Sequence, residues 1–201
     1  MIERGQPWGR QVPAPTGMLE IHSDAELADA LERGGSQPLL LCAGDLATGL
    51  GARTTARDDA STPTLRELPI DALRVHLDGR RVLAVAHIVA RSLNWLHGPV
   101  LFIGNTGFVG RREVVRRGHP NDGRFEIVDI DAAMGARQRL MGLRRIGSGS
   151  HLAHPLVKST QATSLSRVLE PRMRVWVDGR PLGRVRELRV EIIADAGTIY
   201  R

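Results

Sequence analysis

The first quarter of the chain alternates short apolar strands with short amphipathic helices. Apolar runs predict the strands, and the second run is unbroken, as in a strand buried on both faces. Ser23 or Asp24 is a typical N-cap for the first helix, whose apolar residues have helical spacing and which stops at two glycines. The predicted strands are 17–23 and 38–44, and the predicted helices are 25–35 and 45–51.

The pattern changes after a polar stretch at residues 52–66, which is rich in Thr, Asp and Ala and predicts a loop or a weak domain boundary. Beyond it, short apolar or alternating runs are separated by turn residues, which is typical of β structure. Strand-forming segments are 68–91, 98–105, 124–131, 154–169, 172–179, 183–193 and 197–200.

One clear helix interrupts this β region, within residues 131–150. Its pattern is amphipathic, so we expect an apolar face toward the core and a basic face toward solvent. The residues predicted to face the core are Met134, Leu140, Met141 and Leu143, and those predicted to face outward are Arg137, Arg139, Arg144 and Arg145.

Asp-Gly-Arg occurs three times, at 78–80, 122–124 and 178–180. Asp-Gly between two apolar runs is a strong hairpin signal, because a tight primed turn needs positive φ at both central residues. Eight or nine short strands with such corners predict a β-sandwich. The predicted fold class is α+β, mainly β, with a short α/β cap at residues 1–51 and a sandwich at residues 67–201.

The formal net charge of +6 raises the question of nucleic-acid binding. However, 27 of the 28 basic residues are arginine, with Lys158 the one lysine, which indicates a general compositional bias. The chain has three Phe, one Tyr and three Trp, and none of these is interleaved with basic residues in the manner that stacks bases. The composition therefore disfavours nucleic acid and favours an anionic ligand or an anionic lipid surface.

The chain has one cysteine, Cys42, so an internal disulfide and a zinc site built on cysteines are excluded. Its apolar strand predicts a small core residue. No apolar run approaches the length of a membrane span, and the first ten residues lack the apolar segment of a secretory signal. We therefore expect a cytoplasmic protein, with peripheral attachment to a membrane as the alternative.

Glycines at 104, 107 and 110 follow a predicted strand, as in a phosphate-binding loop. Their spacing is not the dinucleotide-binding fingerprint, and the residues that follow read as a strand instead of a capped helix. A glycine-rich bend between strands is the structural alternative.

Several segments, in the same order and at consistent spacing, resemble the bacterial diacylglycerol kinase family, which includes sphingosine-kinase-like lipid kinases. The resemblance covers residues 39–200. The similar segments are "AGDLATGLGA", "FIGNTGFVG" followed by "HPNDGRFEIVDID", "RRIGSGSHLAHPLVKSTQATSLS" and "MRVWVDGRPLG".

The resemblance implies an N-terminal ATP-binding domain with the string G-G-D-G-T and a C-terminal β-sandwich. That string is absent here, and only about 38 residues precede "CAGDLATG", so the first segments resemble a remnant of the ATP-binding half. ATP is therefore not expected to bind this chain alone. Where the family places an acidic residue after the third Asp-Gly, this sequence has Arg180, which cannot act as a base.

The family's interdomain cleft implies a set of ligand-binding residues in this sequence, and its structural cation implies Mg²⁺ at the second Asp-Gly turn. No catalytic residue is assigned. The implied ligand cleft comprises Gly44, Asp45, Asn105, Gly107, Gly110, Asp178 and Arg180. The implied metal site comprises Asp122 with backbone groups of His119 and Arg124.

The sequence thus predicts a lipid-kinase homologue that has lost its nucleotide site. Its function would be to bind a lipid, an anionic metabolite or a partner protein. The alternative is an active ATP-dependent diacylglycerol or lipid kinase that a partner chain completes. The expected partners are an anionic lipid or membrane surface, and either a second copy of this chain or a separate kinase chain.

Overall fold

The structure is a computed structural model that describes residues 7–51, 64–110, 112–115, 117–145 and 154–201. Its N-terminal part confirms the predicted β-α-β-α order and adds one strand that the sequence pattern did not predict. The elements are β1 (Arg10–Pro13), β2 (Leu19–Ile21), α1 (Asp24–Arg33), β3 (Leu39–Leu41) and α2 (Asp45–Gly49). Ser23 is the N-cap of α1, and its side chain accepts a hydrogen bond from the Glu26 backbone N–H.

The rest of the chain is mainly β, so the predicted fold class is confirmed. Its strands are β4 (Thr64–Leu77), β5 (Arg80–Ala84), β6 (His87–Arg91), β7 (Val100–Gly104), β8 (Phe108–Val109), β9 (Arg112–Glu113), β10 (Phe125–Ile130), β11 (Val157–Ala162), β12 (Ser164–Val177) and β13 (Arg180–Tyr200). The third helix is α3 (Ala136–Arg145).

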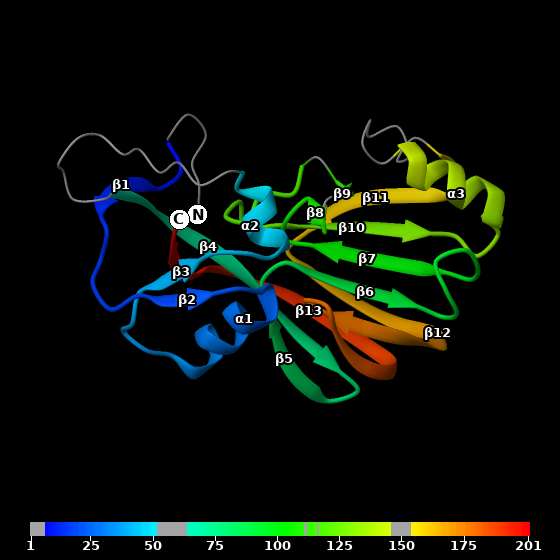
Figure 1. The fold of residues 1–201 in the computed structure, drawn as a ribbon. Coiled ribbons are helices and arrows are strands. Elements are labelled where there is room, and N and C mark those ends of the chain that lie inside the picture. The colour runs from blue at the N-terminus through cyan, green and yellow to red at the C-terminus, as the bar shows by residue number, and fades with distance from the viewer. Residues whose placement is uncertain (1–6, 52–63, 111, 116, 146–153) are drawn as a thin grey trace.

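Among the described residues, eleven strands form one sheet, whose main path is β1-β4-β13-β12-β6-β7-β10-β11. β5 pairs with β4, and β3 pairs in parallel with both β2 and β13, so the N-terminal strands join the same sheet. The N-terminal elements gather at one end of the sheet, and α3 lies at the other end beside β11 (Figure 1). The division into two domains stays a prediction, since residues 52–63 lie outside the described residues.

The largest core lies on one face of this sheet and is built from strands alone. Residues of β4, β5, β6, β7, β10, β12 and β13 pack together there, and the most buried are Leu73, Val75, Ala84, Ala90, Ile103, Leu188 and Val190. No helix contributes to this cluster within the described residues. Strands of the same sheet therefore cover this face, and the arrangement of two packed sheets stays a prediction.

Two further cores position the functional regions. One lies between α1, α2 and the first half of β4, and Ile199 near the end of β13 completes it. The other lies on the opposite face of β7 and β10, where Phe102 and Val128 pack with Val89 and Val115. Two faces of the same strands are therefore apolar, as the unbroken run Val100–Ile103 requires.

Two of the three Asp-Gly corners are the predicted hairpins. Asp78 and Gly79 have φ values of 46° and 85°, and Asp178 and Gly179 have values of 46° and 80°, as primed turns need. They join β4 to β5 and β12 to β13. The third corner, at 122–123, is not a hairpin, because it enters β10, which pairs with β7 and β11.

The expected burial of α3 is partly wrong. Met134 is buried and Leu143 is half-buried, but Leu140 and Met141 are 48% and 41% exposed. Arg139, which was expected in solvent, is only 4% exposed. Its guanidinium donates hydrogen bonds to the backbone carbonyls of Met134, Trp95, Gly98 and Asp131, and these compensate for its burial.

Candidate functional site

A buried polar cluster lies where the first residues of α1 and α2 meet the sheet. Asp24 accepts hydrogen bonds from the backbone N–H groups of Asp45 and Leu46, at 2.6 and 3.0 Å. The first residue of α1 therefore caps the first turn of α2. Gly44 precedes that turn with a φ of 119°, and any side chain there would overlap the Asp24 carboxylate. Burial raises the pKa of Asp24 to about 6.

Asp45 reaches from α2 to two other elements. Its Oδ1 accepts a hydrogen bond from the Gly110 N–H at 2.6 Å, and its Oδ2 lies 3.3 Å from Nδ1 of His87. The second contact is close but is not aligned as a hydrogen bond. Burial lowers the pKa of His87, although the Asp45 carboxylate opposes that shift. The lowered pKa favours the neutral imidazole of His87 beside the Asp45 side chain.

Asp178 binds the backbone of the segment between β5 and β6. Its carboxylate accepts three consecutive backbone N–H groups, from Val85, Ala86 and His87, at 2.8, 3.0 and 2.9 Å. These bonds take the three groups out of the strand ladder, which is why the segment 80–91 forms two strands, β5 and β6, where the sequence predicted one. Burial raises the pKa of Asp178 to about 7.

Asn105 closes the cluster from the end of β7. Its side-chain NH₂ donates to the carbonyls of Asp71 and Val85, at 2.9 and 3.0 Å. Its Oδ1 is buried and has no hydrogen-bond partner, and the only other such side-chain atom among the described residues is His87 Nδ1. Two unsatisfied buried atoms in one cluster are typical of a functional site, because unpaired buried polar groups cost stability.

The predicted cleft residues are therefore only partly brought together. Asp45 contacts Gly110 directly, and Asp178 and Asn105 meet through the backbone of Val85. Gly107 packs against the backbone of Val115 instead, and the Val115 carbonyl leaves no room for a side chain at position 107. Arg180 points to α1, where it binds Asp29 and the carbonyl of Ala25.

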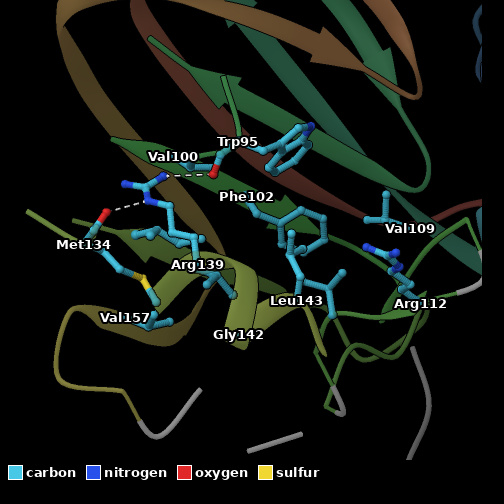
Figure 2. Close-up of a pocket in the computed structure, with 13 residues that line it drawn as sticks. Trp95, Val100, Phe102, Val109, Arg112, Met134, Arg139, Gly142, Leu143 and Val157 are labelled. Carbon is cyan, nitrogen blue, oxygen red and sulfur yellow. Dashed lines mark hydrogen bonds between the residues drawn. The ribbon is translucent and has the colours of Figure 1, made fainter. Parts of the chain in front are cut away.

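An apolar pocket of about 430 Å³ lies between α3 and the outer face of the sheet. Alternate residues of β7 and β10 form its floor, and they share one face because Val128 pairs with Phe102 and Ile130 with Val100. Figure 2 shows the side chains around it, with Arg139 between Trp95 and Met134. The other residues that line it are Val109, Arg112, Val114, Gly142, Leu143 and Val157.

The pocket and the polar cluster meet at β8. Val109 lines the pocket, and the next residue, Gly110, donates its N–H to Asp45. Arg112 follows on β9, exposed and without an ion pair to any described residue. The β8–β9 hairpin thus carries part of an apolar pocket and a cationic group, and it contacts the half-buried carboxyl group of Asp45 on α2. The sequence reasoning missed the pocket, although the unbroken apolar run of β7 signalled a second buried face.

The turn at Asp122 is held mainly by a residue that the sequence did not indicate. Asp71 is fully buried and accepts hydrogen bonds from the Gly123 N–H, the Asn121 side chain and the Asp195 N–H, at 2.7, 3.2 and 2.9 Å. Asp122 Oδ1 accepts the Arg124 N–H at 3.0 Å.

A magnesium ion at this turn stays a prediction. The His119 carbonyl accepts the Asp122 N–H, so that oxygen is already used once. Oδ2 of Asp122 has no hydrogen bond to a described residue, and burial raises the pKa of the carboxyl group. One carboxylate oxygen fits a Mg²⁺ ion that keeps most of its water.

No protein-family model matches this sequence, and no curated protein matches it. The structure does resemble two solved structures, each described as that of a candidate diacylglycerol kinase from Bacillus anthracis str. Sterne and each with a TM-score of 0.52. The fold is diacylglycerol-kinase-like. Both matches have 11% sequence identity and cover 66% of this chain, so they establish the fold alone. They span 56% and 57% of the length of those proteins.

Proposed function

We propose that this chain binds a lipid with an anionic headgroup, with the apolar tail in the pocket under α3 and the headgroup at Arg112. The observation that carries the proposal is the pocket itself: about 430 Å³, lined by Phe102, Val128 and Leu143, and bounded by Arg112. Ligand pockets of this kind combine apolar walls with a few placed polar groups. The diacylglycerol-kinase-like fold supports a lipid as the ligand class.

The surface beside the pocket suits an anionic membrane. Arg139 joins α3 to the loop before β7 through the carbonyls of Trp95 and Gly98, so exposed residues of both segments belong to one region. Arg137 and Arg144 are exposed on the same helix. We call the exposed apolar residues of this region the apolar rim: Leu93, Trp95, Leu96, Leu140 and Met141.

An apolar rim with nearby arginines is the combination that holds proteins at a membrane interface, because tails take up the apolar side chains and anionic headgroups attract the cations. Such contact would deliver a lipid to the adjoining pocket. The helices that the structure describes are too short and too polar to cross a bilayer.

A competition assay tests the pocket. The probe is a fluorescently labelled monoacylglycerol, which has no charge, and the competitor is lysophosphatidylglycerol, which is anionic. Gly142 lines the pocket, and a Cβ there would meet only the Met134 side chain, at 3.8 Å. Gly142→Leu should fill the pocket and weaken both ligands about 10-fold or more. Gly142→Ala, which gains helix propensity but adds little volume, is the matched control.

The headgroup is tested by charge reversal. Arg112→Glu should remove the preference for the anionic competitor and leave the neutral probe bound, whereas Arg189→Glu, on an exposed position of β13, should change neither. Unchanged probe binding in Gly142→Leu would place the ligand elsewhere and refute the proposal.

A second function, phosphate transfer to the bound lipid, is favoured by one observation: Asp45 and His87 form a carboxylate–imidazole pair one residue away from the pocket wall. The missing G-G-D-G-T string argues that this chain alone does not turn over ATP. The test incubates the chain with radiolabelled ATP and diacylglycerol or a sphingoid base. Labelled lipid formed by wild type but not by Asp45→Asn would establish kinase activity.

A further inference from the structure

Three metal-binding side chains meet at the edge of the N-terminal strands, away from the pocket and from the polar cluster. β2 and β3 are parallel, with Ile21 opposite Leu41, so His22 and Cys42 come next on the two strands. The Cys42 N–H donates to the Ile21 carbonyl at 2.8 Å, which extends this pairing. Glu20 lies two residues before His22 and shares its face of the strand. All three therefore gather at the carboxyl ends of parallel strands, a common place for ligands in such sheets.

The distances among the three side chains are those of a chelating group. One carboxylate oxygen of Glu20, one ring nitrogen of His22 and the sulfur of Cys42 all lie within 4.8 Å of one another. Nε2 of His22 is 3.4 Å from Oε2 of Glu20. Neighbouring ligands of a tetrahedral zinc ion are about 3.3–3.8 Å apart, given bonds of about 2.0–2.3 Å. Small rotations of the side chains would therefore close the site.

The backbone around the site is fixed, whereas two of the side chains remain free to adjust. The His22 N–H donates to Oε2 of Glu26 at 2.7 Å, and Ser23, the N-cap of α1, accepts the Glu26 N–H, so two hydrogen bonds join this segment to the first turn of α1. The side chains of Glu20 and His22 are 64% and 63% exposed. Cys42 is half-buried, and its sulfur has one weak contact, with the Leu40 carbonyl at 3.6 Å.

The ligand types determine which ion suits the site. A thiolate and an imidazole favour Zn²⁺ and other borderline transition metals, whereas Mg²⁺ and Ca²⁺ require a shell of oxygen atoms. The single cysteine excludes a site built on several cysteines, but one thiolate is sufficient in a mixed site. Three protein ligands would leave the fourth position to water.

We infer that Glu20, His22 and Cys42 form a binding site for one divalent transition-metal ion, with Zn²⁺ as the preferred ion. Binding displaces the thiol proton of Cys42 to solvent, since the thiolate is the ligand. The ion would tie the ends of β2 and β3 to the start of α1. This inference is independent of the proposed lipid binding, because it uses none of the same residues.

Cobalt titration of the untagged, reduced chain tests the site. Co²⁺ replaces Zn²⁺ and reports its ligands, because a cobalt–thiolate bond absorbs in the near ultraviolet and tetrahedral cobalt absorbs strongly in the visible range. We expect saturation at one ion per chain, both absorption bands, displacement by Zn²⁺ and no displacement by Mg²⁺. Zn²⁺ should also raise the melting temperature, because an ion that binds the folded chain stabilises it.

Variants assign the ligands. Cys42→Ser should abolish the near-ultraviolet band, and both Cys42→Ser and His22→Ala should weaken binding by at least about 10-fold and lose the melting shift. Glu20→Gln should weaken binding less, since an amide oxygen can still coordinate. His97→Ala, an exposed histidine on another loop, is the matched control and should behave as wild type. Circular dichroism of each variant verifies folding.

Failure of Co²⁺ to saturate, or a thiolate band that persists in Cys42→Ser, would overturn the inference. So would equal binding by His22→Ala and wild type.

Discussion

The guanidinium of Arg180 forms a bidentate ion pair with the carboxylate of Asp29, with N–O distances of 2.7 and 2.6 Å. It also donates to the Ala25 carbonyl at 2.6 Å. These bonds join the β12–β13 hairpin to α1. Arg180 occupies the place where the family resemblance implies an acidic residue, so this position has a structural contact in place of an acid. The cation also raises the local positive potential beside Asp178.

Replacing Arg180 should therefore destabilise the contact between the hairpin and α1. The pair is partly exposed, with side-chain exposures of 47% and 42%, so we expect a coupling energy of about 0.5–1 kcal/mol. A double-mutant cycle with Arg180→Ala and Asp29→Ala, followed by urea unfolding, measures it. Arg180→Glu should be less stable than Arg180→Ala, because it places a second acid beside Asp29. Arg80→Ala, an exposed arginine nearby, serves as the control.

Asp178 should be among the most sensitive positions in the chain. Asp178→Ala leaves the backbone N–H groups of Val85, Ala86 and His87 buried without an acceptor, which should cost about 3–5 kcal/mol. Asp178→Asn should cost less, because its Oδ1 can still accept two of them. Asp78 occupies the equivalent corner of the β4–β5 hairpin and binds the N–H groups of Arg186 and Glu187, but it is exposed.

Asp78→Ala should therefore cost less than Asp178→Ala, since water can replace the lost bonds. Urea unfolding of both variants gives the comparison. Equal losses of stability would contradict the role assigned to burial at Asp178.

Asp24 should make stability depend on pH. Its pKa is raised by burial from 3.8 to about 6 in the folded chain, so the folded state retains a proton that the unfolded chain has released. The stability linked to this proton is fully present below pH 3.8 and is lost as the pH rises through 6. Asp178, with a pKa raised to about 7, acts in the same direction. His87, whose pKa is lowered, acts in the opposite direction.

The difference in melting temperature between wild type and Asp24→Asn isolates the first contribution, because the other groups are common to both. Wild type should lose stability relative to Asp24→Asn between about pH 4 and pH 7. A difference that stays constant over this range would show that Asp24 does not titrate differently in the folded chain.

The turn before β10 should depend more on Asp71 than on Asp122. Asp71 is fully buried with three hydrogen bonds, so Asp71→Ala should cost about 3 kcal/mol or more. Asp122→Ala loses one bond to the Arg124 N–H and should cost about 1 kcal/mol. Thermal unfolding of both variants provides the ranking, and a larger loss in Asp122→Ala would reverse our assignment.

The magnesium prediction is tested by comparing wild type with Asp122→Ala. If Mg²⁺ binds at Asp122, millimolar Mg²⁺ raises the melting temperature of wild type, a chelator reverses the rise, and Asp122→Ala does not respond. An equal response in wild type and Asp122→Ala places the ion elsewhere.

The region around the apolar rim should bind anionic vesicles in a salt-dependent manner. Each arginine near such a surface contributes about 1 kcal/mol, and screening reduces it as salt is added. The double change Arg137→Glu and Arg144→Glu should abolish cosedimentation with phosphatidylglycerol vesicles at low salt. Arg184→Glu with Arg189→Glu, on exposed positions of β13, makes the same change in net charge elsewhere. If both double variants cosediment with the vesicles equally weakly, the binding is a non-specific effect of net charge.

Local chemistry determined what could be predicted from the sequence. The two Asp-Gly hairpins and the Ser23 cap were predicted because each depends on residues within a few positions. The break between β5 and β6 was not predicted, since it depends on Asp178, more than 90 residues further along the chain. No local signal marks a strand whose amides bind a distant carboxylate.

The face of α3 was misjudged for a similar reason. Periodicity places arginines in solvent, but four backbone carbonyls, two of them from the loop before β7, allow Arg139 to be buried. Once Arg139 occupies the inner face, Leu140 and Met141 turn outward. Of the predicted cleft, Asp45 and Gly110 do meet, whereas the long side chain of Arg180 reaches toward α1 through a contact that spacing cannot reveal.

The last strand has a consequence for how the chain folds during synthesis. Ile199 is fully buried in the core beneath α1 and α2, and residues 199–200 pair with β3. The core beneath α1 and α2 therefore lacks one wall until residue 199 leaves the ribosome. Contacts between such distant positions form slowly, because a long loop must close before they contribute. Leu27, Leu41 and Leu46 would remain accessible to chaperones until residue 199 has left the ribosome.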